Sequence, residues 1–217
     1  MNKISVVLPV LLRTQKQIDM TYKCLSYMRE RTNVPFELVI VETETQHLIN
    51  EADVYVYEKT KDKANTSINR GFKVASGDYI VYFSNDVYVG ESWLESMLEC
   101  FNKEDCGLST CGAEQLGYKQ SNEIIERIYF PIAMIPKEDA WYDTYYNGFW
   151  DDTDLIMRVY SKGKRMYMNL NSICVHLDRQ TEVPCSSVLE RYEDNRRYFI
   201  NKWKEFDSPT YRALAGI

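Results

Sequence analysis

The feature that most constrains the fold is the alternation of apolar runs with helical spacing through the first half of the chain. The runs "ISVVLPV", "FELVIVE" and "YIVYF" are almost wholly apolar, which is typical of parallel strands covered on both faces. Between them, apolar residues return every three or four positions, as they do on an amphipathic helix. This alternation predicts an α/β protein with a parallel sheet and right-handed crossovers.

The predicted elements follow from these patterns. In the first half we expect strands at 4–10, 36–42, 53–57 and 79–83 and helices at 15–31 and 91–101. A further helix is expected where Ile68, Phe72 and Ala75 recur at helical spacing, and Gly77 is expected to close it. In the second half we expect strands at 129–135, 165–170 and 172–177, a helix from Asp151 to just before Gly163, and an amphipathic helix over 191–204. The sequence shows no repeat or Pro/Gly-rich linker, so we expect a single domain over 1–217.

Composition narrows the class of protein. Hydrophobic residues make up 45% and charged residues 27%, which is ordinary globular usage, and the net charge of −6 disfavours nucleic acid as a partner. The six cysteines form no CxxC pair, so we expect free thiols and a cytoplasmic protein. The N-terminal run contains Pro9 and ends at Arg13, which favours a buried strand over a signal peptide. No window approaches the ~20 apolar residues that span a bilayer.

Polar side chains follow three of the predicted strands. Arg13 and Thr14 come after the first strand, Glu42 ends the second, and the turn 84–86 follows the central strand at 79–83. Ligands of open α/β sheets bind beyond the carboxyl ends of the strands. We therefore expect a cleft at this edge, with Asp86 facing it.

A second acidic cluster, "WDDTDLIMR", opens the helix predicted in the second half. On a helix, Asp154 and Arg158 stand four residues apart and form a favourable ion pair. Asp152 is then free to point elsewhere. Helix capping and surface ion pairing are the alternative explanation of these carboxylates.

These segments, taken in order, resemble the family 2 glycosyltransferases of GT-A fold. The resemblance is carried by "ISVVLPV", "VIVE", "INRGFKVASGDYIVYFSNDVYV", "YDTYYNGFWDDTDLIMRVYSKG" and "SICVHL", from about residue 3 to residue 177. It implies a Rossmann-like half over about 1–112 that binds a nucleotide-sugar, with a mostly parallel central sheet flanked by helices. It also implies a smaller acceptor half over about 113–217 that ends in the C-terminal helix.

The resemblance implies a metal site. Family members carry a D-x-D-like turn, often N-x-D, where this chain has Ser84, Asn85 and Asp86, so Asp86 takes the place of the second acid. His176 matches a late histidine that completes the metal shell in many members. Mn²⁺ or Mg²⁺ suits such ligands and stabilises a diphosphate leaving group. Ser84 departs from the pattern, because a hydroxyl is a weak direct ligand.

The resemblance also implies contacts with the donor. Pro9 and Val10 begin the loop that passes over the base and ribose in relatives. Glu42 stands where relatives commonly have Asp, and a carboxylate that accepts from a nucleobase N–H favours UDP or dTDP. Asn69 matches an Asn that precedes a Gly on the helix before the central strand. The alternative for Asn69 is a local hydrogen bond within the helix.

An acidic pair in the family aligns with Asp151 and Asp152. In an inverting transfer one carboxylate deprotonates the acceptor hydroxyl, and we expect Asp152, with Asp151 as second choice, to be that base. Asp154 and Arg158 would hold the start of the helix in place. Trp150 would stack on an acceptor sugar or pack in the core.

The leading hypothesis is therefore an inverting, metal-assisted glycosyltransferase. Its acceptor would be a glycan, a glycolipid precursor or, against the acidic net charge, a modified nucleic-acid base. A catalytically inactive GT-A domain that acts as a scaffold or binding subunit is the alternative, and Ser84 is its main support. A nucleotidyltransferase of similar fold is disfavoured, because "PVLLRTQKQ" has no glycine-rich loop to hold a triphosphate.

Overall fold

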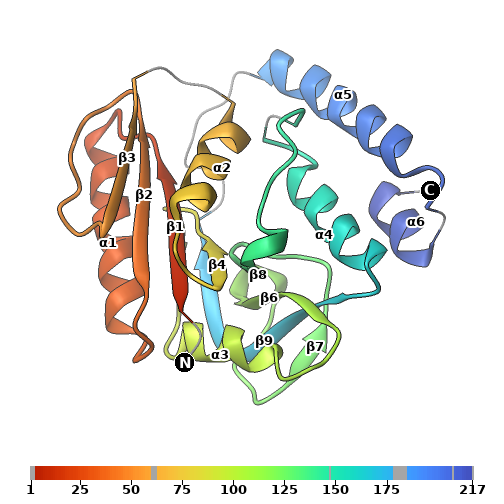
Figure 1. The fold of residues 1–217 in the computed structure, drawn as a ribbon, viewed down its shortest axis with the longest axis horizontal. Helices are drawn as coiled ribbons and strands as arrows, with labels where there is room; N and C mark the ends of the chain where they lie inside the picture. The colour runs from red at the N-terminus through yellow and green to blue at the C-terminus, as the bar shows by residue number, and fades with distance from the viewer. Residues whose placement is uncertain (1–2, 60–62, 147, 178–184, 207, 217) are drawn as a thin grey trace.

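The computed structural model describes residues 3–59, 63–146, 148–177, 185–206 and 208–216. In chain order the elements are β1 (Ile4–Val10), α1 (Gln15–Glu30), β2 (Glu37–Thr43), β3 (Val54–Glu58), α2 (Ala64–Val74), β4 (Tyr79–Tyr82), β5 (Val87–Tyr88), α3 (Trp93–Cys100), β6 (Cys106–Ala113), β7 (Ile124–Glu126), β8 (Ala133–Pro136), α4 (Asp151–Ser161), β9 (Arg165–His176), α5 (Cys185–Trp203) and α6 (Pro209–Ala215). Figure 1 shows the sheet running through the molecule, with α5 and α6 beyond α4.

The strands pair in the order β3-β2-β1-β4-β8-β6-β9-β5, and β7 pairs with β9. The first four strands of this order are parallel, as the sequence predicts. The remainder is mixed: β8 runs antiparallel to β4 and β6, β6 is parallel to β9, and β5 is antiparallel to β9. The carboxyl ends of β1, β2 and β4 therefore meet at one edge.

Both faces of the sheet are covered by helices. Alternate residues of β1 point to opposite faces, so Val6 and Leu8 pack with α1 and α3 while Val7 packs with α2 and α4. This burial on both sides explains why β1 reads as a continuous apolar run. The cysteines Cys24, Cys100, Cys106, Cys111 and Cys174 carry free thiols in this interior.

The helix α2 lies unusually close to the sheet. A Cβ at Gly71 would collide with a methyl carbon of Val7 and would lie 2.8 Å from one of Val41. Only glycine fits this contact, so Gly71 sets the distance between α2 and the strands β1 and β2.

Three predicted strands and one predicted helix differ from the structure. The helix expected over 191–204 is α5, which begins earlier, at Cys185. The strands expected at 165–170 and 172–177 are one strand, β9, with an irregularity in its middle: Cys111 of β6 pairs with Asn169, whereas Gly112 pairs with Ile173. The strand expected at 129–135 is β8, which begins at Ala133. Pro131 just before it has no N–H to donate to a ladder.

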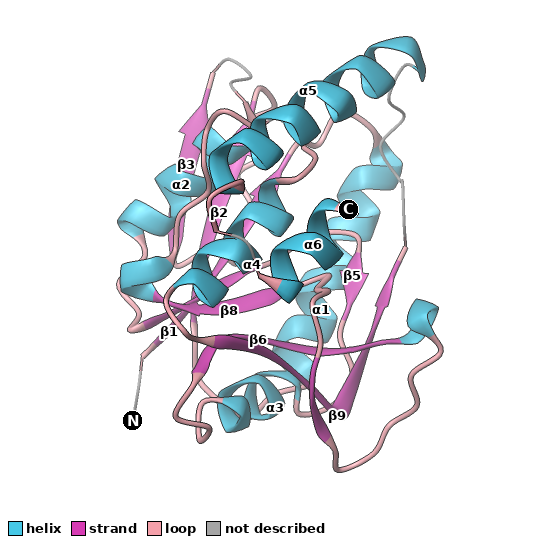
Figure 2. Ribbon diagram, turned by 90° about the vertical axis from the view of Figure 1, so that its right-hand side faces the viewer, coloured by secondary structure: helices cyan, strands magenta, loops and turns pink. Residues whose placement is uncertain are grey.

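The C-terminal helices form a separate apolar cluster with α4. Tyr146, Trp150 and Met157 pack there against Phe199 of α5 and Tyr211 of α6. Figure 2 shows α4, α5 and α6 together on one side of the sheet.

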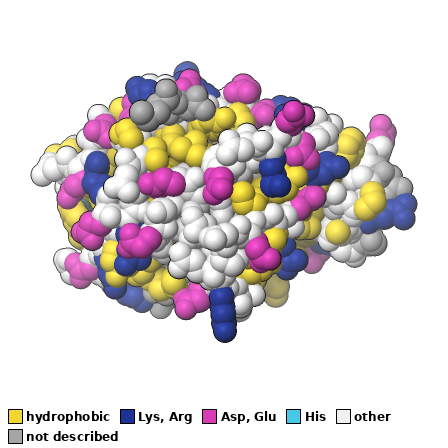
Figure 3. All heavy atoms as spheres, turned by 90° about the horizontal axis from the view of Figure 1, so that it is seen from below, with side chains coloured by type: hydrophobic (Ala, Val, Ile, Leu, Met, Phe, Trp, Pro, Cys, Tyr) yellow, Lys and Arg dark blue, Asp and Glu magenta, His cyan; other side chains and the backbone are white. Residues whose placement is uncertain are grey.

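Two features of the structure concern possible partners: the charge on the surface and the length and apolar character of the helices. Acidic and basic side chains are interspersed on the face shown in Figure 3. In the part of the chain that the structure describes, no helix combines the length and apolar character needed to cross a membrane.

Candidate active site

The turn after β4 is held by one hydrogen bond within it and by two to other segments, α1 and the residue after β9. Asn85 Nδ2 donates to Thr21 Oγ1 of α1 at 2.8 Å, and Ser84 Oγ donates to Asp86 Oδ1. The backbone carbonyl of Asp86 accepts from Leu177 N at 2.9 Å. Ser84, which replaces the usual acid, thus orients the Asp86 carboxylate.

Asp86 and His176 come together across two paired strands. The register of β5 with β9 places Val87 opposite His176, and His176 Nε2 lies 3.4 Å from Asp86 Oδ1. Burial acts to raise the pKa of Asp86, but the contacts with His176 and Ser84 outweigh it and lower the pKa below its ordinary value. Asp86 is therefore a carboxylate at neutral pH.

This pair fits part of a metal shell. A carboxylate oxygen and an imidazole nitrogen are ligands that Mn²⁺ accepts, and Mg²⁺ would use the carboxylate. No group of three or more metal-ligating side chains converges among the described residues. Further ligands would have to be water and oxygens of a bound diphosphate.

A cavity of about 230 Å³ adjoins the pair at the carboxyl ends of β1, β2 and β4. Of the residues predicted to bind the donor, those that line it are Pro9, Val10, Ser84, Asn85 and Asp86. Gln17, Thr43, Ser67 and Tyr82 also line it and were not anticipated. Thr14 caps α1 in a capping box with Gln17, which fixes the start of the helix beside the cavity.

Glu42 and Asn69 lie elsewhere. Glu42 is fully buried, and its two oxygens accept from His47 N at 2.9 Å and Tyr55 Oη at 2.6 Å. Asn69 exchanges two hydrogen bonds with the backbone of Tyr142, each 2.7 Å long. Neither side chain lines the cavity, and Thr43, the next residue after Glu42, does so instead.

The acidic pair opens α4. Trp150 before it adopts a left-handed conformation with φ 67°, which is strained for a residue other than glycine. Burial and then the charge of Asp152 raise the pKa of Asp151 to about 6. Asp152 reaches solvent, yet the protein around it removes enough water to raise its pKa as well. Its Oδ1 accepts from the backbone and hydroxyl of Thr153 at 2.7 and 3.2 Å.

Tyr82 of β4 links the two acidic sites. It lines the cavity, and its pKa is raised first by burial and then by the charges of Asp151, Asp86 and Asp152. The phenol of Tyr82 therefore interacts electrostatically with Asp86 of the turn and with Asp151 and Asp152 of α4. Alternation does not distinguish Tyr82, because it shares its face of β4 with the buried Ile80, and only its place at the carboxyl end of the strand points to it.

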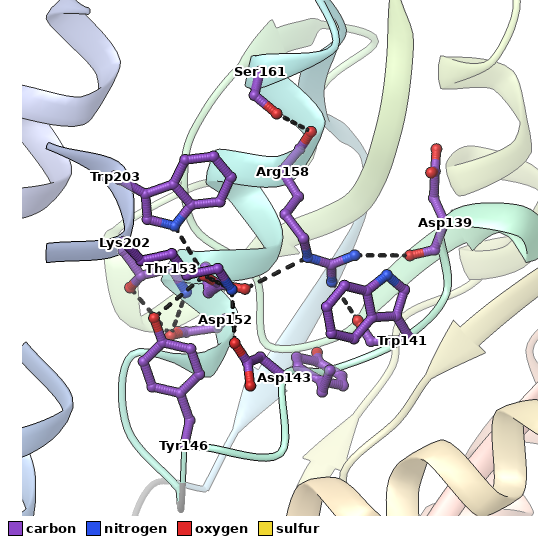
Figure 4. A network of polar contacts seen from close by, with 12 residues as sticks. Asp139, Trp141, Asp143, Tyr146, Asp152, Thr153, Arg158, Ser161, Lys202 and Trp203 are labelled. Carbon is purple, nitrogen blue, oxygen red and sulfur yellow. Dashed lines mark hydrogen bonds and ion pairs between the residues drawn. The ribbon is translucent and has the colours of Figure 1, made fainter. Parts of the chain in front are cut away.

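Asp154 and Arg158 belong to a polar network between α4 and α5, and Figure 4 shows its members Arg158, Tyr146 and Trp203. Arg158 Nε lies 3.5 Å from Asp154 Oδ2, which is the ion pair that the spacing predicts. Asp154 is 1% exposed, and its Oδ1 accepts from Tyr146 Oη at 3.2 Å and Trp203 Nε1 at 2.9 Å. The network thus ties α4 to α5.

Asn65 is a further residue that the sequence did not reveal. It is fully buried on α2, and its Nδ2 donates to the carbonyls of Asp143 at 3.0 Å and Tyr146 at 3.4 Å. Its amide also counters the rise in the pKa of Asp151. Nothing local in "ANTSINRG" signals this contact, which depends on the loop before α4.

A parallel half-sheet continued by a mixed one, with an acidic turn after β4, is the arrangement of a glycosyltransferase of the GT-A class. The model of glycosyl transferase family 2 matches residues 5–158, and the chain belongs to this family, as the sequence resemblance predicts. Its activity is accordingly glycosyl transfer from a nucleotide-sugar.

Solved structures support the fold. A mannosyltransferase from Pyrobaculum calidifontis, PcManGT, in complex with GDP-Man and Mn²⁺, superposes with a TM-score of 0.67 at 14% identity, over 99% of this chain and 68% of that one. At this identity the likeness shows the fold alone, and the predicted GT-A class is confirmed. A comparison with curated proteins finds no match to the sequence.

Proposed function

We propose that the protein transfers a sugar from a nucleoside-diphosphate donor to an acceptor hydroxyl with inversion at the anomeric carbon, assisted by a divalent cation. The observation that carries the proposal is the Asp86–His176 pair at 3.4 Å beside a cavity at the carboxyl edge of the sheet. The PcManGT complex with Mn²⁺ supports a metal at this kind of site.

The cavity would hold the nucleoside end of the donor. Its volume of about 230 Å³ is below the ~300–1,000 Å³ of pockets that enclose a whole ligand, so the diphosphate and sugar would extend past Asp86. Pro9, Val10 and Thr43 would contact the base and ribose. The sequence favours UDP or dTDP only through Glu42, and both oxygens of that buried carboxylate accept from His47 and Tyr55, so we propose a nucleoside-diphosphate donor without assigning its base.

Asp86 and His176 would hold the cation, which neutralises charge on the departing diphosphate when it is bound. Asp152 would accept the proton of the acceptor hydroxyl as that oxygen attacks the anomeric carbon. General-base help of this kind contributes roughly 10²–10⁴-fold. Asp152 reaches solvent, whereas Asp151 is more enclosed, which favours Asp152 as the residue that meets an incoming acceptor.

Release of nucleoside diphosphate from UDP-, dTDP- and GDP-sugars tests the proposal. Asp152→Asn should lower transfer by roughly 10²–10⁴-fold and leave affinity for the nucleoside diphosphate within twofold. Asp194→Asn, which changes an exposed carboxylate of α5, is the matched control and should transfer at the wild-type rate. Wild-type turnover by Asp152→Asn would remove it as the base. A wild-type protein that consumes no nucleotide-sugar would favour the scaffold alternative.

A further inference from the structure

A second, open depression has the acidic pair in its lining, which the donor cavity does not. Phe149, Trp150, Asp152, Thr153, Tyr192 and Leu214 line it, so α4, α5 and α6 all contribute to its wall. We propose that this depression binds a saccharide ring of the acceptor and presents a ring hydroxyl to Asp152. The inference rests on the proposed function.

The wall has the form of an aromatic platform. The ring of Tyr192 lies 5.8 Å from that of Phe149 and 5.6 Å from that of Trp150, both between centroids. Tyr192 is 39% exposed, whereas Trp150 is 9% exposed and packs on Phe199. Trp150 therefore lies behind the platform, and Tyr192 contributes exposed aromatic surface to it. Aromatic rings provide apolar area for the C–H face of a sugar, and a phenol hydroxyl stays available to water or ligand.

Polar groups in the same wall suit a ligand rich in hydroxyls. Trp150 Nε1 is buried and has no hydrogen-bond partner among the described residues. A buried N–H without a partner is unusual and unfavourable, so the wall behind the depression holds an unsatisfied donor. Asp152 and the hydroxyl of Thr153 lie next to it in the chain and line the same depression.

The carboxylates that line the depression disfavour an anionic acceptor, while the guanidinium of Arg191, 5.6 Å from the ring centroid of Phe149, is a cation nearby. Asp151 and Asp152 stand at its rim, and an anionic phosphate backbone would be repelled there. A nucleic-acid acceptor is therefore disfavoured on the same surface that suits an uncharged sugar. The aromatic face beside a carboxylate matches the needs of one saccharide ring: apolar stacking for the C–H groups and a base for one hydroxyl.

Saturation-transfer NMR with methyl glycosides of glucose, galactose, mannose and N-acetylglucosamine tests this inference without requiring turnover. We expect at least one glycoside to receive saturation from the wild-type protein. Tyr192→Ala should reduce that signal at least fivefold, and Tyr192→Phe, which keeps the ring, should retain most of it. Tyr22→Ala, at an exposed tyrosine of α1, is the matched control.

The outcomes separate this inference from the proposed function. If no glycoside receives saturation, or if Tyr192→Ala binds like wild type, the acceptor site lies elsewhere and the inference is overturned. Slow hydrolysis of the nucleotide-sugar by water, measured on the same proteins, reports on the donor site alone. Tyr192→Ala should hydrolyse the nucleotide-sugar at the wild-type rate, because the acceptor site is not needed for that reaction. If the wild-type protein does not hydrolyse any nucleotide-sugar, the proposed function is contradicted, whatever the glycosides show.

Discussion

Lys202 of α5 places its Nζ 2.8 Å from Oδ1 of Asp154 and 2.7 Å from Oδ2 of Asp143. One ammonium group therefore joins the C-terminal helix both to α4 and to the loop that precedes it. Asp154 is almost fully buried, so its charge depends on such partners. The link matters for function because α4 begins with the acidic pair and α5 carries Tyr192.

Lys202→Met should destabilise the protein. Loss of one partner of a buried carboxylate is strongly unfavourable, and because Arg158 and Trp203 remain beside Asp154 we expect a decrease of roughly 2–3 kcal/mol in the free energy of unfolding. Urea denaturation measures the change. Lys204→Met, at an exposed position on the turn after α5, is the control and should unfold like wild type. A Lys202→Met protein of wild-type stability would show that the network is dispensable.

Gly71→Ala should loosen the packing of α2 on the sheet. The added methyl group would collide with Val7 and crowd Val41, and overpacking of this kind outweighs the gain in helix propensity. We expect the free energy of unfolding to fall by roughly 1–2 kcal/mol. Thermal unfolding compares it with Lys73→Ala, an exposed change on the same helix. An alanine variant as stable as wild type would show that the helix can move away without cost.

Much of the fold follows from sequence pattern. The strands β1, β2 and β4 were predictable because burial on both faces makes each one continuously apolar, whereas β3 at the edge of the sheet is only partly buried. Helix α2 ends at Val74 with Ala75 as its C-cap, so Gly77, which was expected to close the helix, lies beyond it against the backbone of Ser5. The second half was harder to predict. The single strand β9 was predicted as two, since its irregularity after Asn169 interrupts the pattern, and the order of β8, β6 and β9 depends on long-range pairing.

Transfer should depend on the ionisation of the acidic pair. The pKa of Asp151 is raised to about 6 by burial and by Asp152, and Asp152 shifts in the same direction. A general base must be unprotonated, so with Asp152 as the base the rate should fall at a pH above the ordinary aspartate range, and with Asp151 as the base it should fall as the pH drops through about 6. Initial rates across this range measure the effect. A rate that stays constant from neutral pH to well below this value would show that neither carboxylate is the base.

The same shift predicts an opposite trend in stability. Because the pKa of Asp151 is higher in the folded protein than in the unfolded chain, the folded state binds the proton more tightly. The resulting stability is present below the unfolded pKa of about 4 and is lost as the pH rises through about 6. Asp151→Asn should therefore match wild type in melting temperature under acidic conditions and exceed it at neutral pH. An equal difference at both pH values would contradict the assignment.

Asn65→Ala should shift the pH dependence of transfer. The amide of Asn65 holds the loop before α4 and lowers the pKa of Asp151, so its removal should move the acidic limb of the rate profile to higher pH. A loss of stability without such a shift would mean that Asn65 acts on the loop alone. Thr66→Ala, on the neighbouring residue of α2, is the control.

Residues of the candidate site could be predicted from the sequence only where they lie at the carboxyl ends of parallel strands. Pro9, Val10 and Asp86 line the cavity as expected, because parallel strands bring their carboxyl ends together. Glu42 does not, since the chain after β2 turns back and occupies its carboxylate with His47 and Tyr55. Tyr192 and Asn65 lie near the acidic pair through contacts between distant segments, which no local pattern encodes.

The proposed function depends on Asp86 and His176 joining a divalent cation to the diphosphate of the donor. Calorimetric titration of UDP, dTDP and GDP, each with Mn²⁺ and with a chelator, tests it most directly. We expect one nucleotide to bind at least ten times more tightly with Mn²⁺, and Asp86→Ala to lose that difference while the protein stays folded. Equal affinity with metal and with chelator, or an unchanged metal effect in Asp86→Ala, would contradict the account.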